Sequence, residues 1–172
     1  MNKDTRSTPE KRSSYKGLMP RTVARFAMIQ SIFYAMNSTD TWGTIVSYVT
    51  NDLFDETGYD VFDEGSLFVD RDFFMRLTHA WSETNRDNLN ALFVDFLPKN
   101  WTLDRMEPAL HAVLLCAVLE LSGGFDTPRP VLVNEYLIAS QAFVHQSRLV
   151  NAILDAACTH YAAHSVPDRA DT

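Results

Sequence analysis

The chain has 172 residues, of which 46% are apolar, a size and composition typical of one globular domain that buries a core without disulfides or metal. Only six glycines are present, which disfavours a protein built on glycine-rich phosphate loops. The net charge of −7 argues at first against a nucleic-acid binder, but residues 1–25 carry +5 and the remaining residues carry −12. A basic segment on an acidic body is typical of a chain that contacts a polyanion at one end, and a merely solvated tail explains it equally well.

The two cysteines indicate the compartment. Cys116 and Cys158 lie far apart in apolar segments and have neither metal-ligand spacing nor a CxxC motif. Buried, reduced thiols in a cytoplasmic protein are therefore expected. No apolar run reaches the roughly 18 residues of a membrane span, and the charged N-terminus does not resemble a signal peptide, so no membrane contact is expected.

The N-terminal part of the chain is expected to be a flexible basic arm over residues 1–17, followed by a first helix. Pro20 suits the first turn of that helix, and Asn37 is expected to end it. Apolar and aromatic residues recur at three- and four-residue steps, which predicts one packed face. The residues expected on this face are Val23, Phe26, Ala27, Gln30, Phe33 and Tyr34.

Residues 41–54 predict a second helix, although their β-branched residues would also suit a strand. Helix is favoured because no partner strand is apparent elsewhere in the sequence. Residues 52–72 then hold eight acids and a single base. Their spacing does not fit a calcium loop, so a solvated acidic connector is expected and no metal site.

The second half of the chain predicts longer helices. Residues 70–97 are expected to form one helical stretch that Pro98 closes. Asp104 and Glu107 have the spacing of a capping box before an apolar central helix over residues 107–122.

Two further helices are expected at about 131–144 and 147–163, with Asn134 and Glu135 near the start of the first of them in a capping role. A polar tail over residues 164–172 follows. The sum is an all-α bundle of six or seven helices in one domain over residues 18–163.

Several motifs, in a fixed order, resemble the NusB family. They are RTVAR at 21–25, QSIFY at 30–34, WTLDRMEPAL at 101–110, AVLEL at 117–121, DTP at 126–128, VNE at 133–135 and LVNAILD at 149–155. The resemblance covers about residues 20–160. It implies two packed helical sub-bundles without catalysis or cofactor. It also implies transcription antitermination through boxA-type single-stranded RNA of nascent ribosomal RNA transcripts, bound together with the ribosomal protein NusE, with RNA polymerase contacted only indirectly.

The resemblance assigns candidate RNA contacts at both ends of the domain. Arg21 and Arg25 lie one helical turn apart, so both guanidiniums could meet successive phosphates, and Lys16 precedes them. A solvated pair of arginines is the alternative. Replacing both arginines by glutamate is expected to weaken RNA binding and leave helicity intact. The remaining candidates are on the last helix, where the family's RNA surface lies: Arg148, Asn151 and Asp155.

Two residues are candidates for contact with the protein partner. Glu120 interrupts an apolar helix, and because burial of an unpaired carboxylate is costly, it is expected to face water or NusE. Phe33 is expected in the core or on the partner surface. Exposed aromatic residues also permit a homodimer.

Departures from the family pattern leave two other functions open. Leu115 stands where family members often carry arginine, and Ala152 where they carry glycine. A protein-only helical interaction module with a decayed RNA surface is one alternative. The RNA-binding front domain of an RNA cytosine methyltransferase is the other, if the sequence is a fragment. An enzyme is disfavoured because no P-loop, dinucleotide fingerprint or histidine metal spacing occurs.

Overall fold

The computed structural model describes residues 19–53, 69–143 and 147–164. Within these ranges all regular elements are helices, which confirms the all-α prediction. The α-helices are α1 (Pro20–Asn37), α2 (Trp42–Leu53), α3 (Arg71–Glu83), α4 (Arg86–Asp95), α5 (Pro108–Ser122), α6 (Arg129–Phe143) and α7 (Ser147–His164), with a 3-10 helix at Leu103–Arg105. The expected arm at 1–17, with Lys16, most of the acidic connector, and the tail beyond His164 lie outside the described residues.

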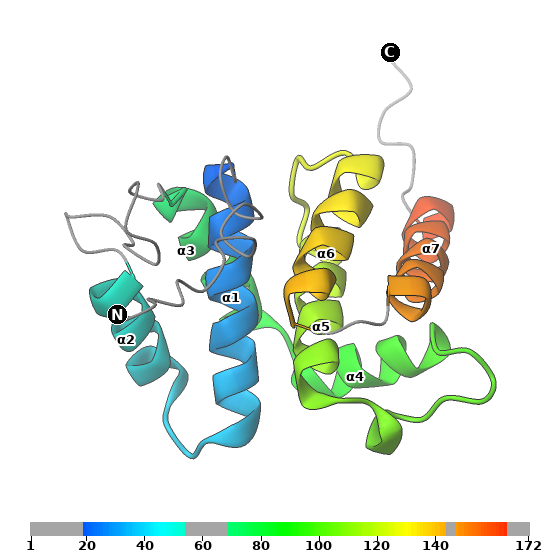
Figure 1. The fold of residues 1–172 in the computed structure, drawn as a ribbon, viewed down its shortest axis with the longest axis horizontal. Coiled ribbons are helices and arrows are strands. Elements are labelled where there is room, and N and C mark those ends of the chain that lie inside the picture. Colours follow the sequence, from blue (N-terminus) through cyan, green and yellow to red (C-terminus); the bar gives the residue numbers. More distant parts are fainter. Residues whose placement is uncertain (1–18, 54–68, 144–146, 165–172) are drawn as a thin grey trace, which may run out of the picture.

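The helices form two lobes that share one core (Figure 1). In the N-terminal lobe, α1 packs against α2 and α3, and in the C-terminal lobe, α5 packs against α4, α6 and α7. The lobes are joined because α1 also packs directly on α5. None of the helices in the described ranges is both long and apolar enough to cross a membrane.

Helix α5 is the centre of the fold because neighbouring helices cover it on most sides. Its side chains from Ala112 to Glu120 are all buried. Ala112 and Ala117 are fully buried, and such small side chains let neighbouring helices approach closely. A carboxylate buried within this segment therefore requires a cationic partner, and α1 provides one.

The N-terminal helix begins as expected, with Pro20 in its first turn, but the predicted packing face of α1 is partly wrong. Phe33 and Tyr34 are exposed, as is Gln30, whereas Met28 and Ile32 are fully buried. More than one face of α1 carries apolar residues at helical spacing, so periodicity does not identify the buried face. The packing of α1 against α2, α3 and α5 decides which face is buried.

The expected single helix over residues 70–97 is two helices. Helix α3 ends at Glu83 and α4 begins at Arg86, after Asn85. The side chain of Asn85 accepts hydrogen bonds from the backbone N–H groups of Asp87 and Asn88, which satisfies two donors at a new helix start. The apolar pattern continues through this break, which is why periodicity alone missed it.

The expected capping interactions are also wrong. Asp104 lies in the 3-10 helix, and Glu107 is the N-cap residue of α5 without a side-chain capping hydrogen bond. Pro108 begins α5 instead, and its missing N–H needs no partner in a first turn. Helix α6 begins at Arg129, so Asn134 and Glu135 lie in its second turn and cannot cap it.

Candidate nucleic-acid interface

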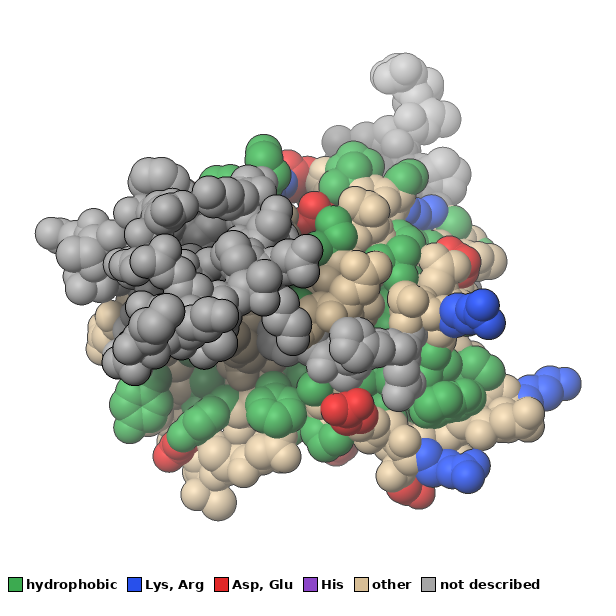
Figure 2. Space-filling view, viewed as in Figure 1, with side chains coloured by type: hydrophobic (Ala, Val, Ile, Leu, Met, Phe, Trp, Pro, Cys, Tyr) green, Lys and Arg blue, Asp and Glu red, His purple; other side chains and the backbone are tan. Residues whose placement is uncertain are grey.

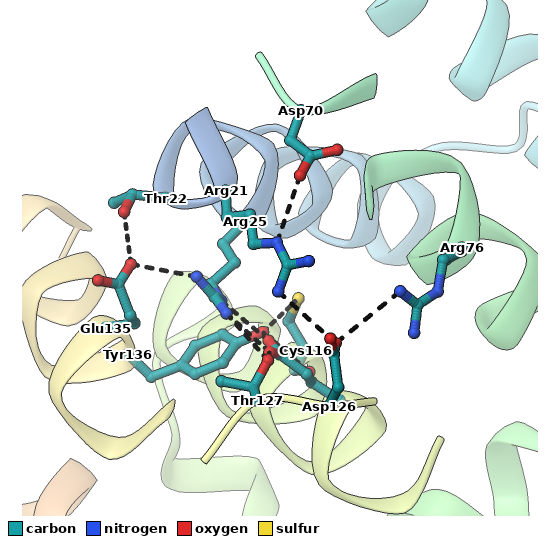
Figure 3. Close-up of polar contacts among 11 residues, drawn as sticks. Arg21, Thr22, Arg25, Asp70, Arg76, Cys116, Asp126, Thr127, Glu135 and Tyr136 are labelled. Carbon is teal, nitrogen blue, oxygen red and sulfur yellow. Dashed lines mark hydrogen bonds and ion pairs between the residues drawn. The ribbon is translucent and has the colours of Figure 1, made fainter. Parts of the chain in front are cut away.

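The N-terminal end of α1 lies where the two lobes meet. It faces the first turns of α6, the loop that follows α5, and Asp70, which caps α3 (Figure 3). Gly124 in the loop has a positive φ of 68°, which glycine adopts without steric cost. The turn carries Asp126 and Thr127 back towards α1, so charged groups from α1, α3, α5, α6 and this loop converge there.

A buried ion pair between Arg25 of α1 and Glu120 of α5 lies at the base of this junction. The Arg25 side chain is 4% exposed and that of Glu120 is 0% exposed. Nε of Arg25 donates to Oε2 of Glu120 at 2.9 Å, and Nη2 donates to Oε1 at 2.7 Å. This two-point geometry is the strongest form of an arginine–carboxylate pair.

Three further groups complete the pair (Figure 3). The hydroxyl of Tyr136 donates to Oε2 of Glu120 at 2.8 Å, and the hydroxyl of Thr127 donates to Oε1 at 2.7 Å. On the other side, Nη1 of Arg25 donates to Oε2 of Glu135, which also accepts from Thr22. The network connects α1 to α5, α6 and the loop between them. It gives the buried Glu120 carboxylate hydrogen bonds from protein donors in place of water.

Burial alone would lower the pKa of the Arg25 guanidinium, but the hydrogen bonds from Arg25 to Glu120 and the charges of Glu120 and Glu135 raise that pKa above its ordinary value. Arg25 is therefore a fixed cation inside the fold. The expectation that Arg25 meets RNA phosphate from a helix surface is wrong, because its guanidinium is enclosed and paired. The expectation that Glu120 faces water or a protein partner is wrong for the same reason, because Arg25 compensates its burial.

Cys116 borders the network and should be chemically inert. Burial raises the pKa of the Cys116 thiol to about 12, and the neighbouring Tyr136 hydroxyl offsets this rise only in part. Because the thiolate is the reactive form, we expect Cys116 in a Cys158→Ser variant to react with a disulfide reagent about a hundredfold more slowly in the folded than in the urea-unfolded protein. Cys158 in a Cys116→Ala variant is partly exposed and serves as the comparison. Equal rates for Cys116 in both states would contradict this assignment.

Arg21, one turn before Arg25, remains at the surface. Its side chain is 43% exposed and pairs with Asp70 at 3.3 Å and with Asp126 at 3.6 Å. Its guanidinium also lies 5.0 Å from the ring centre of Phe73. Of the two arginines of α1 that were predicted to bind phosphate, Arg21 is thus exposed and Arg25 is buried.

A shallow groove of about 360 Å³ opens beside Arg21, between the starts of α1 and α6. Met19, Pro20, Pro128 and Val131 provide its apolar walls. Polar groups of Arg21, Asp70, Thr127 and Glu135 also line it. The groove therefore combines apolar walls with the exposed guanidinium of Arg21 and the carboxylates of Asp70 and Glu135, so it offers both an apolar surface and polar groups to a ligand.

The candidates on the last helix occupy a different part of the surface. Arg148, Asn151 and Asp155 are all exposed on α7, which packs on α5 and α6 in the C-terminal lobe (Figure 1). The amide of Asn151 donates to Asp155 at 2.8 Å, as their four-residue spacing allows. Within the described part of the chain, no hydrogen bond or ion pair joins these three residues to Arg21 or Arg25.

Phe33 lies near the opposite end of α1 and is 40% exposed. Tyr34 and Met36 are exposed beside it in the sequence. Figure 2 shows hydrophobic side chains gathered along the lower edge of the view, where α1 ends in Figure 1. Of the two expected positions of Phe33, core and surface, the structure therefore has the surface.

Several residues of this site were not identified from the sequence. Thr127, Glu135 and Tyr136 reach the buried pair, while Arg76 and Asp126 lie beside Arg21. The DTP and VNE motifs were visible as motifs, but Thr127 and Glu135 meet Arg25 across 102 and 110 residues of sequence. Sequence spacing carries no information on such contacts.

An all-helical protein of two joined lobes, with an arginine-bearing groove where they meet, is the class that fold and site define. The NusB family model matches residues 23–158, and the chain belongs to the NusB family. The transcription antitermination protein NusB of Gluconobacter oxydans is 35% identical over 139 residues, which cover 78% of this chain and 84% of that protein. NusB of Granulibacter bethesdensis is 30% identical over 141 residues, covering 80% and 86%.

The fold is shared with a solved structure as well. NusB of T. maritima aligns with a TM-score of 0.64 over 82% of this chain and 92% of that one, at 22% identity. At this identity the likeness concerns the fold alone. It agrees with the two-lobed helical arrangement described above.

Proposed function

We propose that this protein binds boxA-type single-stranded RNA of nascent ribosomal RNA transcripts together with the ribosomal protein NusE, and so acts in transcription antitermination. The main support for this proposal is that residues 23–158 match the NusB family and that relatives bear the name transcription antitermination protein. The exposed arginine at the groove is the local feature that supports RNA binding.

In this proposal the RNA follows the junction of the two lobes. Arg21 meets a phosphate, and the groove beside it receives part of an unstacked nucleotide, as single-stranded RNA-binding sites commonly do. Lys16 precedes Arg21 in the chain and adds a further positive charge. Arg25 positions α1 from below by its pair with Glu120 and does not itself touch the RNA.

The exposed group on α7 extends the proposed RNA surface. Arg148 supplies a cation, and Asn151 supplies an amide that is free to exchange its bond with Asp155 for one to a ribose or base. Asp155 then orients that amide. The proposed surface for NusE is the exposed end of α1 at Phe33, where an apolar, aromatic patch suits a protein partner.

The test is fluorescence anisotropy of a labelled boxA-type RNA, with and without NusE, at several salt concentrations. Arg21→Gln is expected to weaken binding about tenfold, the effect of losing one charge-assisted hydrogen bond of about 1.5 kcal/mol. The salt slope should fall by about 0.7, the value for one phosphate on a single strand. The double Arg21/Arg25→Glu variant is unsuited, because a glutamate at position 25 would face Glu120 and Glu135 in the core.

Arg86→Gln is the matched control, because Arg86 is also exposed and also stacks on an aromatic ring, that of Trp81, but lies on α4. It should leave RNA affinity unchanged. Absence of RNA binding by the folded wild-type protein under all conditions would contradict the proposal and support a protein-only interaction module.

A further inference from the structure

A second exposed arginine lies opposite Arg21, on α3, a helix for which the sequence predicted no RNA contact. Arg76 of α3 is 50% exposed, and its Nη1 lies 3.9 Å from Oδ1 of Asp126. The same oxygen lies 3.6 Å from Nη1 of Arg21 (Figure 3). A single anionic oxygen thus sits between two guanidiniums that come from different helices.

Aromatic rings hold both guanidiniums in place. Arg21 lies 5.0 Å from the ring centre of Phe73, and Arg76 lies 4.8 Å from that of Phe125. The two rings contact each other edge to face at 5.7 Å. Asp70, fixed as the cap of α3, also accepts from Nε of Arg21. The cations are therefore oriented before any ligand arrives, which reduces the entropy lost on binding.

Asp126 is a weakly held occupant of the position between them. Its side chain is 70% exposed, and both of its ion pairs are longer than the 2.7–2.9 Å typical of a charge-assisted hydrogen bond. Exposed pairs of this kind contribute little to stability because water screens them. Asp126 also lies in the loop after Gly124, outside any helix, so its carboxylate can rotate away without disturbing a helix.

We propose that Arg76 joins Arg21 as a second phosphate ligand for RNA, and that the Asp126 carboxylate occupies the phosphate position in the free protein. The binding phosphate displaces Asp126 and bridges Nη1 of both arginines, while Asp70 keeps Nε of Arg21. Asp126 therefore acts as an intramolecular competitor that lowers RNA affinity. This inference rests on the proposed RNA-binding function and adds to it a specific ligand and a specific competitor.

Two opposite effects are expected in the same anisotropy titration. Arg76→Gln should weaken RNA binding about fivefold and lower the salt slope by about 0.7, as loss of one phosphate contact does. Asp126→Asn should strengthen binding about threefold, since the neutral amide repels no phosphate. Arg86→Gln and Asp95→Asn make the same charge changes on α4 and should alter affinity less than twofold.

The double variant Arg76→Gln/Asp126→Asn tests whether the two residues act on one site. If Asp126 competes for the phosphate that Arg76 binds, the gain from Asp126→Asn should be smaller in the Arg76→Gln background than in the wild type. Equal gains in both backgrounds, no gain at all, or an unchanged affinity of Arg76→Gln, with RNA still bound by the wild type, would overturn this inference and leave the proposed function intact. A wild-type protein that binds no RNA would overturn both. Circular dichroism of each variant verifies that the helices are retained.

Discussion

Replacing Arg25 by glutamine is expected to lower the free energy of unfolding by about 3–5 kcal/mol, the effect of removing one partner of a buried ion pair. The Glu120 side chain is 0% exposed, so its charge would lose its only cationic hydrogen-bond donors among the described residues without gaining water. Glutamine retains much of the side chain's length but none of its charge. Urea unfolding followed by circular dichroism at neutral pH measures the change.

Arg21→Gln is the control for the Arg25 variant. The Arg21 side chain is 43% exposed and its pairs are longer, so its loss should cost only about 0–1 kcal/mol. The two variants remove the same charge one helical turn apart, so a difference in stability reports burial and pairing alone. Similar stabilities of both variants would show that Arg25 is not held as described.

A second large loss of stability is expected when Phe73 is replaced, because this core residue packs its ring against the guanidiniums of both Arg21 and Arg25. Phe73 is 1% exposed, and its ring centre lies 5.0 Å from the Arg21 guanidinium and 4.9 Å from that of Arg25. Phe73→Ala should lower the free energy of unfolding by about 3–5 kcal/mol, because it removes buried apolar area and leaves a cavity. Chemical denaturation at constant pH measures this loss.

Phe73→Leu separates packing from the support of Arg21. Leucine retains much of the apolar volume, so its cost in stability should be well below that of alanine. The ring under Arg21 is nevertheless lost, so RNA affinity should fall in Phe73→Leu and stay unchanged in Phe74→Leu, its neighbour in the core, whose own ring is fully buried. RNA affinity that falls equally in both variants would mean that the effect comes from stability alone.

The buried pair has a structural consequence beyond stability. Arg25 belongs to the N-terminal lobe, whereas Glu120, Glu135, Thr127 and Tyr136 belong to the C-terminal lobe. Apolar contacts between α1 and α5 would tolerate small shifts of one helix along the other, but a bidentate pair in the interface does not. The network therefore fixes how the groove at the start of α1 faces the loop that carries Asp126.

Much of the fold could be predicted from the sequence by itself. The apolar segment over 107–122 predicted the central helix α5, Pro20 predicted the start of α1, and the helical prediction at 41–54 was confirmed as α2. These features are local: periodicity, proline and glycine positions, and the order of short motifs. They also sufficed for the family, because the motifs lie along most of the chain.

The tertiary structure alone decided which charged residues face water. Arg21 and Arg25 are equivalent in the sequence, a turn apart on one helix, yet only Arg21 remains at the surface. From the sequence, Glu120 was predicted to face water or a protein partner, because Arg25, its ion-pair partner 95 residues away, could not be identified. A charge inside an apolar helix is either exposed or paired, and the pairing depends on which helices pack together, a long-range outcome that local sequence patterns do not encode.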